Sequence, residues 1–148
     1  HYQGEIQSRK LRDIATWADV IHSLDSSGHI TKLDSLLTQP QDIFLQLSLD
    51  GSEGRGGASA TELAHLGKAV SATPSLSLLG LMCVPPLSSD PDAAMAEISA
   101  IHKAFSADFP TASHLSMGMS NDFDTAIRHG ATHIRVGTSI LGSRSPHE

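Results

Sequence analysis

Two junctions between strand and loop near the end of the chain could together hold an anion. The first follows Ser116 and contains Gly118 and Ser120, and Ser120 is expected to be the N-cap of a helix. The second contains Gly137 and Thr138 at the end of an apolar strand. Glycines let backbone N–H groups approach a ligand closely, and hydroxyl groups add donors. The pattern predicts one phosphate site shared by both junctions. The alternative is that these residues have only structural roles, since glycine is common where strands end and serine is common where helices begin.

Arg135 lies within the apolar strand that leads to the second junction. A buried guanidinium is costly without a partner, so a partner is expected. Because side chains alternate along a strand, Arg135 should address the same side of the sheet as Gly137. Two interpretations stay open: Arg135 belongs to the anion site, or it forms a structural ion pair with one of the sixteen acidic residues.

Other groupings of reactive side chains have weaker support. The nine histidines show neither HxH nor HExxH spacing, which argues against a metal site. Ser120 with His114 and Asp122 would make a hydrolase trio by composition only, because the GxSxG elbow of such enzymes is missing from the sequence. We therefore do not expect a structural zinc site or a serine hydrolase.

Strands and helices must alternate along the chain to position these residues. The expected strands cover residues 18–24, 42–49, 76–84, 113–116 and 132–137. The expected helices cover residues 8–16, 31–37, 59–72, 92–109 and 121–129. In the fourth of these, Ala94, Ile98, Ile101 and Phe105 recur every three or four residues, which predicts one apolar face that packs on the sheet. Such alternation predicts an α/β fold in which right-handed crossovers join parallel strands. Pattern alone leaves an open doubly wound sheet and a closed barrel as alternatives.

Composition excludes several broad classes of protein. The 148 residues are 39% hydrophobic, which suits a compact domain spanning residues 1–148. A net charge of −6 provides no basic stripe for nucleic acid. The longest apolar run, residues 78–86, is shorter than the ~20 residues that cross a membrane. With Cys83 as the only cysteine, no internal disulfide forms, which suits a cytoplasmic location.

Residues 118–144 resemble the signature of the pyridoxal phosphate homeostasis protein family, whose fold is similar to the barrel domain of alanine racemase. Residues 1–10 resemble its H-aromatic-x-G and Q-S-x-K segment, residues 22–25 the end of its fourth strand, and residues 80–82 its G-L-M motif. The likeness therefore extends over nearly the whole chain. It implies the C-terminal part of a (β/α)8 TIM-type barrel of the alanine racemase N-terminal-domain type.

The resemblance implies a protein that binds pyridoxal 5'-phosphate and buffers or delivers it without being an enzyme. Carried over by position, the cofactor-binding residues are Met82, Met119, Ser120, Arg135, Gly137 and Thr138. Ser120, Gly137 and Thr138 would contact the phosphate, Arg135 would face the pyridine nitrogen, and the two methionines would lie against the ring. A cationic arginine there disfavours protonation of the ring and weakens it as an electron sink. The alternative is a racemase-like enzyme dependent on the same cofactor, which would need a further acid/base residue.

The sequence departs from the family pattern in its lysines. The family's Schiff-base lysine stands on the first strand, ahead of the H-aromatic-x-G motif at which this sequence begins. The first two strands and most of the third are therefore expected to come from elsewhere in the same protein or from another copy. Lys10, Lys32, Lys68 and Lys103 are all expected in helices or loops, so none is assigned to the aldehyde.

Overall fold

The computed structural model describes residues 1–52 and 56–142, so the last two residues of the 118–144 signature lie outside the described part. Within it the chain forms a five-stranded sheet in the order β1-β2-β3-β4-β5, with every neighbouring pair parallel. The strands are β1 (Val20–Leu24), β2 (Gln41–Leu47), β3 (Leu76–Cys83), β4 (His114–Met119) and β5 (His133–Arg135). Each strand lies beside its successor in sequence, as in a barrel wall, whereas a doubly wound sheet reverses its order.

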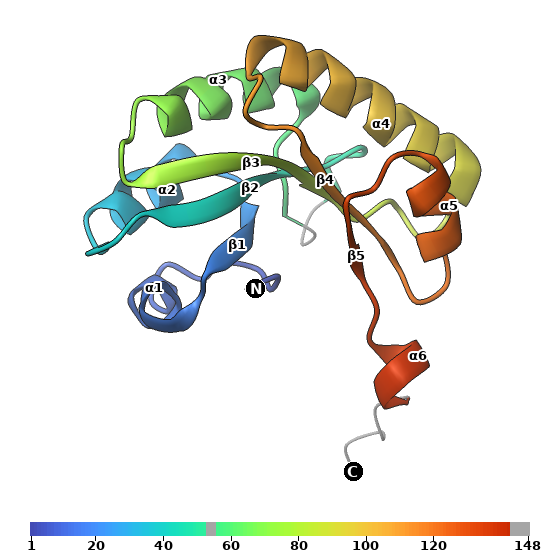
Figure 1. Cartoon of the computed structure of the whole chain (residues 1–148), viewed down its shortest axis with the longest axis horizontal. Coiled ribbons are helices and arrows are strands. Elements are labelled where there is room, and N and C mark those ends of the chain that lie inside the picture. The colour runs from blue at the N-terminus through green and yellow to red at the C-terminus, as the bar shows by residue number, and fades with distance from the viewer. Residues whose placement is uncertain (53–55, 143–148) are drawn as a thin grey trace.

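The connecting helices lie around the outside of the curved sheet, and Figure 1 shows α3 and α4 over its convex side. The helices are α1 (Leu11–Trp17), α2 (Ser27–Asp34), α3 (Ala60–Ser71), α4 (Pro91–Asp108), α5 (Phe123–Arg128) and α6 (Thr138–Leu141). All five predicted strands and five predicted helices are confirmed, with ends displaced by a few residues. The single turn of α6 was not predicted. No helix in the described part of the chain is both long and apolar enough to cross a membrane.

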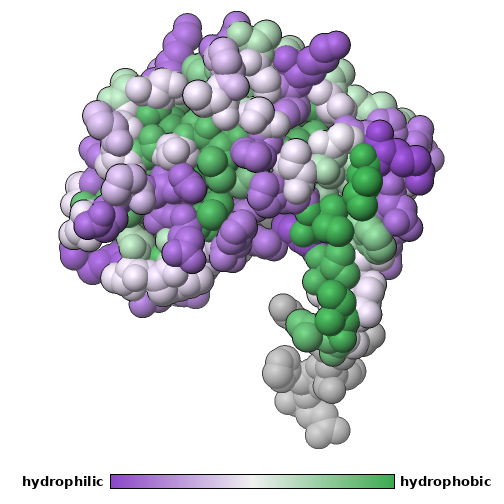
Figure 2. Space-filling view, in the orientation of Figure 1, coloured by the Kyte–Doolittle hydropathy of each residue, from purple (hydrophilic) through white to green (hydrophobic). Residues whose placement is uncertain are grey.

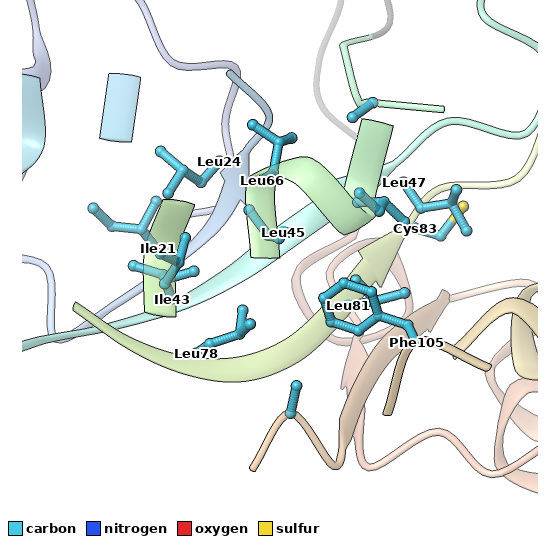
Figure 3. Packing of buried hydrophobic residues seen from close by; sticks show 14 of the residues in the cluster. Ile21, Leu24, Ile43, Leu45, Leu47, Leu66, Leu78, Leu81, Cys83 and Phe105 are labelled. Carbon is cyan, nitrogen blue, oxygen red and sulfur yellow. The ribbon is translucent and has the colours of Figure 1, made fainter. Parts of the chain in front are cut away.

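The main hydrophobic core fills the space between the sheet and its helices. Figure 3 shows side chains of β1, β2 and β3 meeting Leu66 of α3 and Phe105 of α4. In α4 the predicted apolar face is confirmed, because Ala94, Ile98 and Phe105 are buried and Ile101 packs against the same core. This face of the sheet is therefore a structural layer that holds the strands in place.

The opposite, concave face of the sheet has a mixed character. Phe44 alternates with Ile43 and Leu45 along β2, and it packs with Val20 and Met82 in a small second cluster. Three polar side chains that alternate onto this face are also buried: His22, Gln46 and Ser116. Buried polar groups need partners, so this interior is organised by hydrogen bonds as well as by apolar packing.

The C-terminal end of β4 differs from the prediction, and the difference lies at Gly118. The expected strand ended at Ser116, but β4 continues to Met119. Gly118 has φ +90°, and the register with β5 shifts between Ser116 and Met119. A glycine with positive φ therefore produces an irregularity inside the strand, where the sequence had indicated the end of the strand. A Cβ at this position would lie 2.5 Å from the Cβ of Ala126, so a larger residue does not fit.

The sheet forms half of a barrel, and apolar side chains flank its open β5 edge. Tyr2 extends the β1 side through a parallel bridge to Ile21. On the β5 side, Ile134, Ile140 and Leu141 are 40%, 74% and 86% exposed, and Figure 2 shows apolar surface along β5 and α6. An open edge with apolar flanks favours association with further strands.

Residues 1–148 prepared by themselves are accordingly expected to self-associate or to unfold without a sharp transition. Unpaired strand edges and the exposed apolar side chains of β5 and α6 would remain in contact with water. Analytical ultracentrifugation combined with denaturant unfolding would measure both properties. A cooperatively unfolding monomer of 15.6 kDa would show that additional strands are not required.

Candidate functional site

A cavity of about 500 Å³ lies where β3, β4 and β5 end. Its walls come from the loop at 85–91, from residues 119–122 and from residues 135–138. The carboxyl ends of parallel strands share one edge of a sheet, which is where ligands bind in α/β barrels. Five of the six predicted site residues line this cavity: Met119, Ser120, Arg135, Gly137 and Thr138. The proline-containing loop at 85–91 was expected only as a connection, and the structure makes it one wall.

Met82 is the predicted site residue that does not line the cavity. It is 2% exposed and packs with Val20 and Phe44 on the concave face. On β3 it is paired in register with Ser116 of β4. Its contact with a cofactor ring remains a prediction.

Ser120 joins the two predicted junctions. Its Oγ accepts hydrogen bonds from the backbone N–H groups of Gly137 and Ser139, both at 3.3 Å. The prediction that Ser120 caps α5 is wrong, because the N-cap is Asp122. Asp122 Oδ1 instead accepts the N–H of Met119 at 2.6 Å, which folds residues 119–122 into a turn and delays the helix. Ser120 is thereby released to contact the second junction.

Gly137 is not required by the fold. Its φ of −122° lies outside the left-handed region, and a Cβ built there has no heavy atom within 4 Å. Gly118 differs, since there both the backbone conformation and the packing exclude a side chain. The open space at Gly137, beside N–H groups that already converge on one oxygen, fits a site in which a ligand oxygen takes that place.

Arg135 is held by two neutral acceptors. Its Nη1 donates to Ser116 Oγ at 2.8 Å, and its Nη2 donates to the carbonyl oxygen of Cys83 at 2.9 Å. Within residues 1–52 and 56–142 no carboxylate lies within salt-bridge distance of Arg135, so the ion-pair interpretation fails there. Burial lowers the pKa of Arg135, but an ordinary guanidinium titrates so far above neutrality that it remains cationic. A half-buried cation with no salt-bridge partner among the described residues therefore lines the cavity.

The sequence reasoning missed the buried partners of Arg135. Neither His22 nor Ser116 was predicted as a site residue, yet His22 Nδ1 lies 3.0 Å from Ser116 Oγ. The His22 ring stacks on Phe44 with 4.4 Å between ring centroids. The available signal was alternation along β1 and β4, which places polar side chains on the face opposite the main core.

The four lysines lie away from the cavity. Lys10, Lys32, Lys68 and Lys103 are exposed, and none lines the cavity. Lys10 precedes α1, and the other three lie on α2, α3 and α4. The described residues thus offer N–H and O–H donors and a cation but no lysine amine at the cavity.

Residues 2–145 match the family described as alanine racemase, N-terminal domain, and the chain belongs to that family. Within it the chain falls among the pyridoxal phosphate homeostasis proteins. It is 39% identical to such proteins from Mycobacterium leprae and Corynebacterium glutamicum, over 99% and 97% of this chain. It spans 63% of the first protein's length and 70% of the second's. The family expected from the sequence is thus confirmed.

Solved structures confirm the fold. PipY of Synechococcus elongatus, determined without pyridoxal phosphate, has a TM-score of 0.87 and 31% identity, covering 94% of this chain and 68% of PipY. The same protein with the cofactor bound has a TM-score of 0.81 and 30% identity, over 94% of this chain and 68% of PipY. Lysine decarboxylase of Selenomonas ruminantium, at 15% identity and TM-score 0.67 over 91% of this chain and 43% of its own, shares the fold alone. The five parallel strands are part of a barrel of the alanine racemase N-terminal type.

Proposed function

We propose that this chain provides the phosphate-binding and ring-facing side of a pyridoxal 5'-phosphate site, in a cytoplasmic protein that holds the cofactor for homeostasis and is not an enzyme. The observation that carries the proposal is the convergence of Ser120, Gly137, Thr138 and Arg135 on one cavity. The names of the relatives and the cofactor-bound PipY structure support it. Residues 1–148 would then form the C-terminal part of one barrel domain.

The phosphate would be held at the meeting point of the two junctions. The N–H groups of Gly137 and Ser139 already point at one oxygen, that of Ser120. A phosphate oxygen in that region would receive N–H donors, and the hydroxyls of Ser120 and Thr138 would add two more. Hydrogen bonds to a charged acceptor are roughly twice as strong as neutral ones, so a few suffice for a specific site.

The ring would be held at the other end of the cavity by Arg135. Pyridoxal phosphate supplies an aldehyde that combines with amines and a ring that withdraws electrons most strongly when its nitrogen is protonated. The fixed positive charge of Arg135 opposes that protonation. Arg135 therefore favours holding the cofactor over promoting carbanion chemistry.

The described residues around the cavity do not favour the racemase alternative. Among the described residues that line the cavity, the ionisable ones are Asp122 and Arg135. Asp122 already accepts the N–H of Met119, and an arginine does not exchange protons near neutral pH. A racemase needs residues that remove and return a proton, and this wall of the cavity supplies none.

In the full-length protein, covalent attachment of the cofactor is expected at a lysine outside residues 1–148. Lys10, Lys32, Lys68 and Lys103 all lie away from the cavity. Borohydride reduction of protein treated with near-stoichiometric pyridoxal phosphate, followed by peptide mapping, would identify the modified lysine. One dominant modified lysine among these four would contradict the proposed site.

The non-catalytic part of the proposal has a separate test. The cofactor-loaded full-length protein is incubated with each alanine enantiomer, and optical rotation is followed, with a known racemase as the positive control. Unchanged rotation is expected, because the described cavity wall lacks a proton-exchanging residue. Steady loss of rotation would establish the racemase alternative.

A further inference from the structure

We propose that Ser116 and His22 are positioning residues that orient Arg135 toward the bound cofactor, an inference that rests on the function proposed above. The three side chains form a continuous row of hydrogen bonds that runs from the half-buried Arg135 to the buried Ser116 and His22. Arg135 Nη1 lies 2.8 Å from Ser116 Oγ, and Ser116 Oγ lies 3.0 Å from His22 Nδ1. The proposal assigns a role to two side chains that do not themselves line the cavity.

The chain of hydrogen bonds depends on the curvature of the sheet. Arg135 and Ser116 stand on the neighbouring strands β5 and β4, but His22 stands on β1, with β2 and β3 between. His22 and Ser116 are 94 residues apart in sequence. They meet because both point into the concave side, where the His22 ring lies against Phe44 of β2. The interior of the half-barrel is thus bridged from β1 to β5.

The direction of each hydrogen bond follows from which atoms carry protons. Arginine only donates, so Ser116 Oγ is the acceptor in its bond with Arg135. Ser116 is 0% exposed, and its own hydroxyl proton needs an acceptor. Among the described residues, His22 Nδ1 is the acceptor that the structure places within reach of that hydroxyl. His22 Nδ1 must therefore lack a proton.

The other ring nitrogen of His22 then carries the proton. His22 Nε2 lies 2.9 Å from His1 Nδ1, so it can donate to that atom. The donations run in one direction, from Arg135 through Ser116 and His22 to His1. Such an order fixes both the tautomer of His22 and the rotation of the Ser116 hydroxyl.

Only a neutral His22 can take part in this series of hydrogen bonds, because a protonated Nδ1 could not accept the hydroxyl proton of Ser116. Burial, followed by the charges of Arg135 and His133, lowers the pKa of His22 from 6.5 to about 4. The titratable groups that face His22 are His1, His133 and Arg135, and the His22 and His133 ring centroids lie 6.1 Å apart. His22 therefore stays neutral at physiological pH.

The consequence for binding is confined to one end of the cavity. Arg135 has two protein anchors, Ser116 Oγ and the carbonyl of Cys83. Loss of the first would free the guanidinium to rotate, so its remaining N–H groups would meet the cofactor ring less often. The phosphate end does not depend on these bonds. Variants of Ser116 or His22 should weaken pyridoxal phosphate and leave inorganic phosphate unaffected.

The first test measures the tautomer directly in cofactor-free full-length protein. Nitrogen NMR of histidine-labelled protein, with His22 assigned by comparison with His22→Asn, reports which ring nitrogen carries a proton. A neutral ring protonated on Nε2 is expected from pH about 8 down to about 5.5. A ring protonated on Nδ1, or a cationic ring at pH about 6, overturns the proposal whether or not the protein binds cofactor.

The second test measures dissociation constants for pyridoxal phosphate and for inorganic phosphate in the full-length protein. Ser116→Ala should weaken the first about tenfold and leave the second unchanged. His22→Asn retains an oxygen that can accept from Ser116, whereas His22→Leu fills the space without an acceptor. Asn should therefore restore affinity that Leu loses. Equal losses in both variants, or a parallel loss of phosphate binding, would mean a merely structural role.

Discussion

Replacing Gly137 by leucine is expected to weaken binding of pyridoxal phosphate strongly while changing the free energy of unfolding little. The backbone of Gly137 has φ −122°, and a Cβ would meet no atom of the chain within 4 Å. A leucine side chain would instead fill the space beside the N–H groups that converge on Ser120. Losing two charge-assisted hydrogen bonds corresponds to about 3 kcal/mol or more, which is at least about a hundredfold in affinity.

The measurement is a cofactor titration and a denaturant unfolding curve for each variant of the full-length protein. Thr138→Ala provides a graded comparison, because it removes one hydroxyl donor, worth about 0.5 to 1.5 kcal/mol to a neutral acceptor and more to a charged phosphate. Gly118→Ala is a matched control with the opposite expected effect. The φ of +90° and the 2.5 Å approach to the Cβ of Ala126 predict that this variant loses stability. Near-normal cofactor affinity in Gly137→Leu would remove this glycine from the proposed site.

Acid is expected to destabilise the protein between pH about 6.5 and about 4, with His22 as a main cause. The pKa of His22 is about 4 in the folded protein and ordinarily 6.5. Between these values the unfolded chain binds the proton and the folded chain does not, so stability is fully present above the higher value and is lost as pH falls to the lower. The difference amounts to about 3 kcal/mol. Burial lowers the pKa of His133 and His102 too, which adds in the same direction.

Denaturant unfolding of the full-length protein at a series of pH values measures this effect. The matched variant is His22→Asn, which removes the titrating group and keeps an acceptor for Ser116. Its unfolding free energy should depend less steeply on pH than that of the wild type over the same interval. Identical pH dependence in the two proteins would show that His22 is not buried as a neutral ring.

The order of the elements was predictable from the sequence because hydrophobic periodicity reports strands and helices locally. All five strands were located, and the apolar face of α4 was read from the spacing of Ala94, Ile98 and Phe105. The choice between barrel and open sheet was not predictable from periodicity, since crossover units look alike in both. The family resemblance indicated the barrel, and the strand order agrees with it.

The parts of the site that are formed by short runs of consecutive residues were predictable from the sequence. Ser120 and Gly137 were expected to converge, and they do, but the role of Ser120 as a cap for α5 was wrong. Gly80 shows why local patterns are insufficient: a Cβ there would lie 1.7 Å from the carbonyl oxygen of His114, a contact that only the paired strands reveal. The meeting of His22 with Ser116 likewise depends on curvature over four strands.

A crystal structure of the full-length protein with pyridoxal phosphate would test the central claim most directly. We expect the phosphate within hydrogen-bonding distance of the Gly137 N–H and of Ser120 Oγ, with Thr138 beside it. The ring nitrogen should face Arg135, which should keep its bonds to Ser116 and to the carbonyl of Cys83. A phosphate more than about 10 Å from Gly137, or a cofactor bound at a different edge of the barrel, would contradict the proposed site.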